Sequence, residues 1–247
     1  LGDVYKRQRW HWFALSLFAA LAIAAFYLLS TPNIYTRTAA ILVKDDTKSG
    51  SSTTMSEFSD LGIFKSNTNI NNELLTLKSP TLMTEVVRRL GLNETYTVRK
   101  GLKDVGLYKS NPVAVSYRHQ DETPVSFKID FSSKEEFTIS DVMINGEELE
   151  TEFSGKMGDS IRMEVGTFVI NPTKYWNDSF VGTSIRYNKG SVRAVTDYYA
   201  TALRADLGNE DATIINLSID DVSIPKAEDI LNTLIEVYNE KLSLIHI

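Results

Sequence analysis

The sequence contains no cysteine, and this absence excludes several kinds of chemistry. Without a thiol the chain forms no disulfide, holds no metal through thiolates and has no cysteine nucleophile. Histidine is nearly as scarce, with three in 247 residues, and no two of these have the spacing of a metal site. The histidines are His11, His119 and His246. We predict no metal site and no cofactor.

Motifs for phosphate binding and nucleophilic catalysis are also missing: there is no G-x-x-x-x-G-K-[ST], G-x-G-x-x-G or G-x-S-x-G. The adjacent acids Glu135 and Glu136, like Glu147 and Glu148, fall on predicted strands. Neighbouring side chains on a strand point to opposite faces, so neither pair suits joint acid–base work. The net charge of −6 argues against a nucleic-acid partner. We predict no catalytic residue and no enzymatic activity in this chain.

The most distinctive feature present is the run from 10 to 29, which has no charge, glycine or proline. About 20 residues at a helical rise of roughly 1.5 Å span about 30 Å, the thickness of a bilayer's hydrocarbon core. We predict a transmembrane helix, with aromatic residues near its ends where interfacial belts are expected. Its main anchor residues are Trp10, Trp12, Phe13, Leu17, Leu21, Phe26 and Tyr27.

Lys6, Arg7 and Arg9 precede this run, and basic residues beside a span mark the cytoplasmic side. We therefore expect residues 1–9 to form a cytoplasmic stub of an inner-membrane protein whose bulk is periplasmic. A cleaved signal peptide is the alternative, but its apolar core would end after about 7–15 residues. The apolar run continues to Leu29, which favours a retained anchor.

Both ends of the chain look foreign. Residues 2–8 and 242–247 resemble translated sequencing adapter at the ends of metagenomic gene models. We therefore expect these ends to be non-native and the chain to be a fragment that is cut at its C-terminus. Among the basic residues before the anchor, only Arg9 would then be native.

Residues 30–110 form the first part of a predicted α/β domain. A strand is expected over 34–44, a polar loop over 45–54, and two helical pieces over 68–91. Ser79 and Pro80 suit the N-cap and first position of the second piece, and Gly91 suits its C-terminal cap. Arg88 and Arg89 near that end could bind phosphate, but helix-end arginines are usually solvated.

Residues 111–187 change to an alternation of period two, which predicts an antiparallel β module inserted into the α/β domain. Asn145-Gly146 is a strong hairpin turn, and a second strand pair is expected around Gly166. Tyr175 and Trp176 could stack on a sugar. Aromatic residues in small β modules more often belong to the core, and we favour that interpretation.

Residues 188–241 return to the α/β domain, with a helix over 191–199, strands over 200–207 and 212–219, and a helix over 225–238. Asp220 and Asp221 could bind a cation, but they more often cap the following helix. The hydrophobic content of 43% and charged content of 23% are typical of a folded domain. The predicted fold class is α+β: a membrane-anchored periplasmic α/β domain with an inserted antiparallel β module.

In this order, the elements resemble bacterial chain-length determinant proteins, the polysaccharide co-polymerases. The similar stretches are PNIYTRTAAILVKD at 32–45, NELLTLKSPTLM at 72–83, VVRRLGL at 86–92, INLSID at 215–220 and PKAEDILNTLIEVY at 225–238. The residues that carry the resemblance in a structural role are Tyr35, Glu73, Leu74, Leu77, Ser79, Pro80, Leu90, Pro225, Ala227, Asn232 and Tyr238.

The resemblance implies two transmembrane helices around a periplasmic α/β domain and a homo-oligomeric ring in the inner membrane. It implies regulation of the length and export of capsule, exopolysaccharide or O-antigen chains. The implied partners are the membrane, the polymerase or export machinery and the polysaccharide itself. The inserted β module is most similar to the tyrosine-autokinase branch, some members of which add a C-terminal cytoplasmic kinase.

Two other functions stay open from sequence: a membrane-tethered carbohydrate-binding module and the extracytoplasmic sensor domain of a receptor. For the fold, we expect the helices within 72–92 and 225–238 to pack on the strands within 34–43 and 212–219. Leu217→Asp should then unfold the domain, because an unpaired buried carboxylate costs several kcal/mol.

Overall fold

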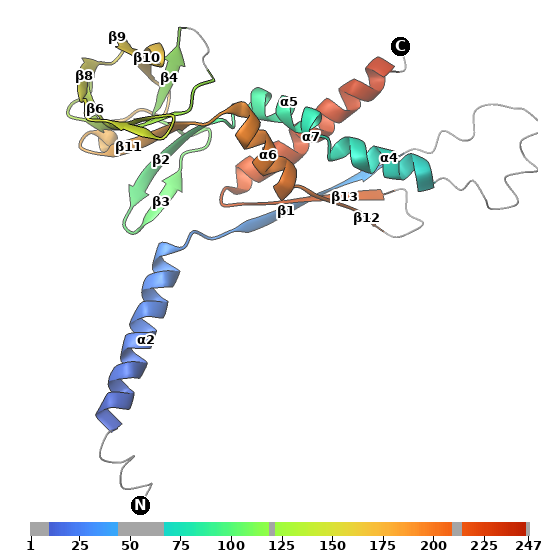
Figure 1. Cartoon of the computed structure of the whole chain (residues 1–247), viewed down its shortest axis with the longest axis horizontal. Helices are drawn as coiled ribbons and strands as arrows, with labels where there is room; N and C mark the ends of the chain where they lie inside the picture. Colours follow the sequence, from blue (N-terminus) through green and yellow to red (C-terminus); the bar gives the residue numbers. More distant parts are fainter. Residues whose placement is uncertain (1–9, 44–66, 119–121, 209–213, 246–247) are drawn as a thin grey trace, which may run out of the picture.

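The computed structural model describes residues 10–43, 67–118, 122–208 and 214–245, which form three parts (Figure 1). These are a single projecting helix, a body of helices on a small sheet, and a β module beside that body. We call the last two the α/β body and the β module. The predicted loop over 45–54 and the N-terminal stub lie outside the described residues, as do His119 and His246.

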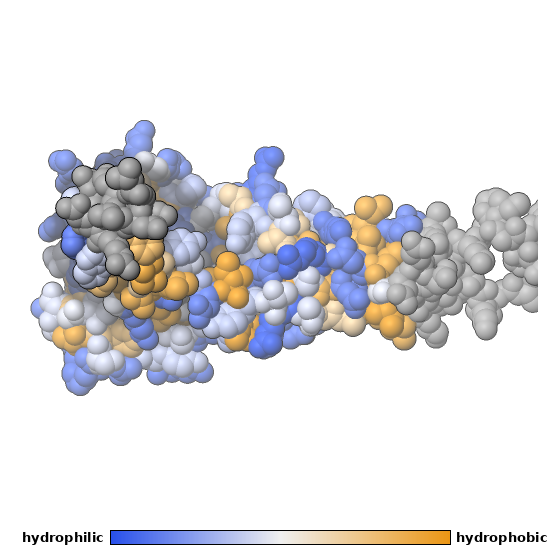
Figure 2. Space-filling view, turned by 90° about the horizontal axis from the view of Figure 1, so that it is seen from below, coloured by the Kyte–Doolittle hydropathy of each residue, from blue (hydrophilic) through white to orange (hydrophobic). Residues whose placement is uncertain are grey.

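The helix α2 (Trp10–Ser30) confirms the predicted apolar helix and extends it by one residue. Its side chains are apolar around the whole circumference, and none is buried in the described structure. It projects from the body on the side viewed in Figure 2. By length and composition it can cross a membrane. It ends where the Thr31 backbone N–H donates to the Tyr27 carbonyl, one residue before Pro32.

The α/β body is built on an antiparallel sheet with strand order β1–β13–β12. Ala39 of β1 lies opposite Leu217 of β13, and Ile41 lies opposite Ile215, so the chain segment after α2 pairs with one near the C-terminus. The elements of the body are β1 (Tyr35–Leu42), α4 (Asn67–Leu77), α5 (Pro80–Leu90), α6 (Val192–Ala202), β12 (Arg204–Leu207), β13 (Ile214–Asp221) and α7 (Ile224–Ile245).

Helix packing covers this sheet. The helix α7 packs on β1 and β13, α4 contacts β12, and α5 packs against both α6 and α7. Leu217, Leu234 and Val86 are fully buried in the shared core. The predicted packing on β1 and β13 is confirmed for α7, whereas α4 contacts β12 instead and α5 packs on other helices. The helix α7 runs seven residues past the predicted end at 238, and Leu242 packs against the core.

Local capping confirms the predicted helix α5. The Ser79 side chain accepts a hydrogen bond from the Thr81 backbone N–H, and Pro80 occupies the first helical position. Gly91 ends the helix with φ +61°, in the left-handed region that favours glycine. Its backbone N–H donates to the Arg88 carbonyl.

The β module contains two sheets that share one core. One has the order β3–β2–β11–β5–β6–β7 with β8 paired to β6, and the other has the order β4–β10–β9. The elements are β2 (Glu94–Lys100), β3 (Lys103–Gly106), β4 (Val113–Tyr117), β5 (Val125–Phe131), β6 (Glu136–Ile144), β7 (Glu147–Leu149), β8 (Phe153–Lys156), β9 (Ser160–Met163), β10 (Gly166–Pro172), the 3-10 turn η1 (Asp178–Phe180) and β11 (Ser184–Lys189). The hairpin predicted at Asn145-Gly146 is confirmed.

Two element boundaries differ from the prediction. The β structure begins at Glu94 rather than at 111, because β2 pairs with β11. Most residues of β2 are polar or charged, so this strand shows no clear hydrophobic alternation. The helix α6 continues to Ala202, through residues predicted as strand, because Tyr199 on its last turn is buried in the core of the body. The division of the chain into domains stays a prediction.

Candidate functional site

The structure brings no metal-binding cluster together within the part of the chain that it describes. No group of three or more histidine, aspartate or glutamate side chains there is placed to hold a metal ion. His11 lies exposed on α2. Glu135 and Glu136 are exposed, as are Glu147 and Glu148 on the short strand β7. The candidate sites are therefore surfaces and contacts between elements.

The predicted anchor residues all lie on α2. Each has an exposed side chain, and none is covered by another part of the described structure. They are Trp10, Trp12, Phe13, Leu17, Leu21, Phe26 and Tyr27. Apolar side chains around a whole helix need an apolar environment, and a lipid bilayer provides one.

The first strand after α2 is tied to the body by polar contacts. The Thr36 hydroxyl donates to an Asp220 carboxylate oxygen at 2.5 Å, and Nη2 of Arg204 donates to the other oxygen at 2.8 Å. The Thr36 hydrogen bond and then Arg204 lower the pKa of Asp220. Arg37 Nε lies 3.1 Å from the Glu228 carboxylate of α7. These contacts, with the ladder to β13, fix the start of β1 to the body.

A second polar cluster lies where β13 turns into α7. One Asp221 oxygen accepts from the Ser223 backbone N–H at 2.8 Å, and the other lies 2.9 Å from Nζ of Lys226. Burial alone would lower the pKa of Lys226, but Tyr199 and Asp221 outweigh it and the pKa is raised. The structure thus gives Asp221 a role in the turn before α7 but not in capping its first turn, and it pairs Asp220 with Thr36 and Arg204.

A third contact joins the β module to α7. The Tyr108 hydroxyl donates to Asp229 at 2.8 Å, and Lys109 Nζ lies 2.6 Å from the same carboxylate oxygen. Partial burial would raise the pKa of Asp229, but hydrogen bonds from Lys109 and Tyr108 outweigh it and lower the pKa. The segment after β3 is therefore held to the same helix that packs on β1.

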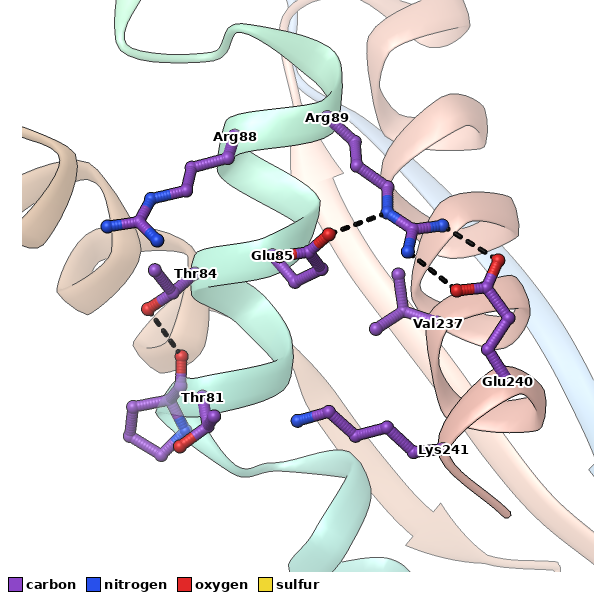
Figure 3. Close-up of a pocket in the computed structure, with 9 residues that line it drawn as sticks. Thr81, Thr84, Glu85, Arg88, Arg89, Val237, Glu240 and Lys241 are labelled. Carbon is purple, nitrogen blue, oxygen red and sulfur yellow. Dashed lines mark hydrogen bonds and ion pairs between the residues drawn. The ribbon is translucent and has the colours of Figure 1, made fainter. Parts of the chain in front are cut away.

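A groove of about 450 Å³ lies between α5 and α7 (Figure 3). Arg89 crosses it: its Nε donates to Glu85 at 2.9 Å, and its two Nη atoms donate to Glu240 at 2.8 and 2.6 Å. These hydrogen bonds raise the pKa of Arg89 and lower that of Glu240. Arg88 points to the other side of α5 (Figure 3). The two arginines do not converge on one anion, and Arg89 is paired with two carboxylates rather than being solvated alone.

The motif residues that carry the resemblance lie in the core, at the start of a helix or on the surface. Glu73 of α4 and Tyr238 of α7 meet, with the tyrosine hydroxyl donating at 2.7 Å. Leu77, Ala227 and Tyr238 are buried, Leu74 and Leu90 pack at the edge of the core, Ser79 and Pro80 begin α5, and Tyr35, Pro225 and Asn232 are exposed. Sequence reasoning missed the Glu73–Tyr238 pair, which only the meeting of α4 and α7 reveals.

The aromatic pair of the β module separates into a core residue and a surface residue. The Trp176 ring lies 4.8 Å from that of Phe131 and 6.1 Å from that of Phe180, and it packs against the core. Tyr175 is exposed, with Lys174 Nζ 5.0 Å from its ring centre. The core interpretation is thus right for Trp176 and wrong for Tyr175, because adjacent residues of this loop face opposite ways.

A comparison with protein families finds a match for the N-terminal part of this arrangement. Residues 5–90 match the model of the family Wzz, chain length determinant protein. That stretch includes α2, β1, α4 and α5, and it ends at the last residue of α5. No curated protein matches the chain. Over residues 5–90, with its apolar helix, first strand and helix pair, the chain is similar to the chain length determinant family.

Proposed function

We propose that this chain is the anchored periplasmic part of a polysaccharide chain-length determinant in the bacterial inner membrane. The observation that carries the proposal is the family match over the anchor, β1 and the helix pair. The five motif stretches extend the similarity beyond that match, since two of them form β13 and α7. The chain then regulates the length and export of capsule, exopolysaccharide or O-antigen chains.

The proposed mechanism depends on assembly rather than on catalysis. Identical subunits form a closed ring through a heterologous interface, in which one side of each body meets the other side of the next. The contacts of Thr36 and Arg37 hold each body in a fixed relation to β1 and its anchor. The ring holds the polymerase or export machinery, and its geometry limits how far the polysaccharide grows. Neither a cofactor nor a nucleic acid takes part.

The β module supports a finer proposal within this family. It lies between α5 and α6 in the chain and has a core of its own, as expected for an insertion into the α/β domain. We assign the chain on this basis to the tyrosine-autokinase branch. Sequencing the parent gene tests the assignment: a nucleotide-binding motif after a second span supports it, and its absence from the complete gene contradicts it.

The function is tested by expressing the chain in a bacterium that lacks its own chain-length determinant. We expect the polysaccharide ladder on a gel to change its most abundant length. The matched control is Leu17→Arg, because a charge at the middle of a span costs about 2.5–3.5 kcal/mol on insertion scales. A ladder that is the same for the chain, the control and the empty vector would contradict the proposal.

The ring is tested separately by the mass of the detergent-purified chain in light scattering. A discrete multimer with more than two subunits supports ring assembly, and a concentration-independent monomer contradicts it. The two experiments separate assembly from regulation, since a chain could form rings without changing the polymer.

A further inference from the structure

Exposed apolar side chains gather where α2 joins the body. Outside α2, the described residues include twelve large apolar side chains that are exposed, and half of them surround this junction. The six are Ile34, Tyr35, Leu102, Val105, Tyr198 and Val222. Soluble surfaces carry such residues singly, so their gathering in one place calls for a partner.

Two pockets show that five of these residues are neighbours, and Leu102 lies beyond them at the tip of the same hairpin as Val105. One is lined by Pro32, Asn33 and Tyr35 after the anchor, by residues 103–106 of the β2–β3 hairpin, and by Val222. The other is lined by Ile34, Tyr198 and Val222, among others. The hairpin, the start of β1 and the turn before α7 therefore share one face, which is the face that carries α2 (Figure 2).

The tip of the β2–β3 hairpin combines apolar and basic character. Lys100 pairs with Lys103 at the end of the ladder, and Gly101 turns the chain with φ +63°. Leu102 in the turn is 49% exposed. Arg99, Lys100 and Lys103 outweigh the single acid Asp104, so the tip carries a net positive charge. In Figure 1 the tip points toward the end of α2.

A lipid surface fits this tip better than a protein partner does. Ile34 follows Ser30 by four residues, and an extended chain spans at most about 3.3–3.6 Å per residue. If α2 spans a bilayer, the surface of that bilayer lies within roughly 14 Å of Ile34. Tyrosine and lysine are suited to the headgroup region, where an amphipathic ring or a long stem reaches both environments. The basic side chains match the anionic phosphates of lipids.

We infer that the β2–β3 hairpin rests on the outer surface of the membrane beside α2, with Leu102 in the headgroup region and Lys100 and Lys103 at lipid phosphates. This inference rests on the proposed membrane anchoring. A single helix leaves a body free to rotate about the helix axis. A second contact through the hairpin fixes that rotation, and Tyr108 and Lys109 pass the constraint to α7 through Asp229.

The absence of cysteine makes the test direct, because any introduced thiol is the only one. Leu102→Cys carries an environment-sensitive fluorophore, and the full chain is reconstituted in vesicles of phosphatidylethanolamine and phosphatidylglycerol. The control is Glu164→Cys in the β9–β10 turn, another exposed hairpin tip on the side of the module away from α2 (Figure 1). We expect headgroup-attached spin labels to quench the Leu102 site and to leave the Glu164 site unquenched.

A second pair of variants tests the charges. Each basic residue near an anionic surface contributes about 1 kcal/mol, so Lys100→Glu and Lys103→Glu should each lower the docked fraction relative to the undocked one by roughly fivefold or more. Quenching at the Leu102 site reports this loss. Vesicles of neutral lipid alone should weaken quenching in the unchanged chain as well.

The outcomes separate the inference from the anchoring. Equal, weak quenching at both sites, in a chain that stays with the vesicles after carbonate washing, overturns the hairpin contact alone. A chain that carbonate removes from the vesicles overturns the anchoring and, with it, this inference. Strong quenching at Leu102 that both charge variants leave unchanged overturns the role of the lysines.

Discussion

The cores of the two folded parts of this molecule are built from different kinds of side chain. The core of the α/β body is mainly aliphatic, and its elements are also joined by polar contacts such as Glu73 to Tyr238. The core of the β module is rich in aromatic rings. The ring centre of Phe127 lies 4.9 Å from that of Tyr187 in the same sheet and 5.4 Å from that of Phe168 in the other, so the second contact joins the two sheets. The packing of aliphatic side chains between helices and sheet thus stabilises the body, and contacts between aromatic rings stabilise the module.

The family match divides the molecule in another way. It covers α2, β1, α4 and α5, whereas the β module and the later elements α6, β12, β13 and α7 follow it in the chain. Only part of the α/β body is therefore matched, and its sheet pairs the matched strand β1 with the unmatched strand β13.

The largest expected effect comes from a charge in the core of the body. Leu217 is fully buried opposite Ala39, so Leu217→Asp loses its apolar burial and places a carboxylate without a partner, which together cost several kcal/mol. We expect the body to unfold, with loss of hydrogen-exchange protection in β13, α5 and α7.

The matched control for that change is Leu75→Asp, because Leu75 lies in the same body but is exposed on α4. It should leave the protection of the body almost unchanged. Loss of the module's protection together with that of the body in Leu217→Asp would show that the two cores unfold as one unit and would contradict their independence.

Sequence patterns predicted most of the body and of the module, and the reasons for the failures are physical. The two helical pieces predicted over 68–91 and the cap at Ser79 come from local signals, and both appear in the structure. Strand β2 escaped prediction because its order comes from pairing with β11, which is distant in sequence, and not from its own alternation.

The candidate site was less predictable than the fold. The run of α2 is a signal of composition, so it could be identified at once. The apolar junction around Val105 and Tyr198 could not, because these residues are far apart in sequence and each alone is an ordinary exposed side chain. Only the arrangement of the hairpin beside the start of β1 brings them to one face.

The second effect tests the aromatic core of the module. Phe127→Ala removes a fully buried ring between the two sheets, and such a change typically costs about 3–5 kcal/mol. We expect a lower midpoint of chemical unfolding and loss of exchange protection in β5, β10 and β11. The helices of the body should keep their protection; if α7 loses protection equally, the two cores are more tightly coupled than their separate packing indicates.

A smaller effect is the difference in how the stability of the two parts depends on pH. Burial raises the pKa of Glu94 in β2 above its ordinary value of 4.5, with Lys189 offsetting part of the shift. The charged form of Glu94 is therefore costly to the folded module, and that cost is relieved as pH falls through the raised pKa toward 4.5. Asp229 has a pKa below its ordinary 3.8, so its contribution to stability is present above 3.8 and is lost on further acidification.

Thermal unfolding between pH 7 and pH 3 checks this contrast. Lowering the pH toward 4.5 should first stabilise the module. The contact of α7 with Tyr108 and Lys109 should weaken only below pH 3.8. Asp229→Asn should remove part of the acid loss below 3.8 and leave the change near 4.5 intact. An identical pH profile in Asp229→Asn would contradict the role given to this carboxylate.

The smallest expected effect is at the surface groove of the body. Arg89→Met removes the ion pairs with Glu85 and Glu240, which are accessible to solvent and therefore screened by salt. We expect a slight fall in melting temperature at low salt that disappears at high salt. Arg88→Met is the control, because Arg88 leaves α5 on the other side (Figure 3) and should show no salt-dependent change. If both variants behave alike, the Arg89 bridge contributes nothing to how α5 and α7 are held. The stability of the body would then depend on its apolar core, as that of the module does.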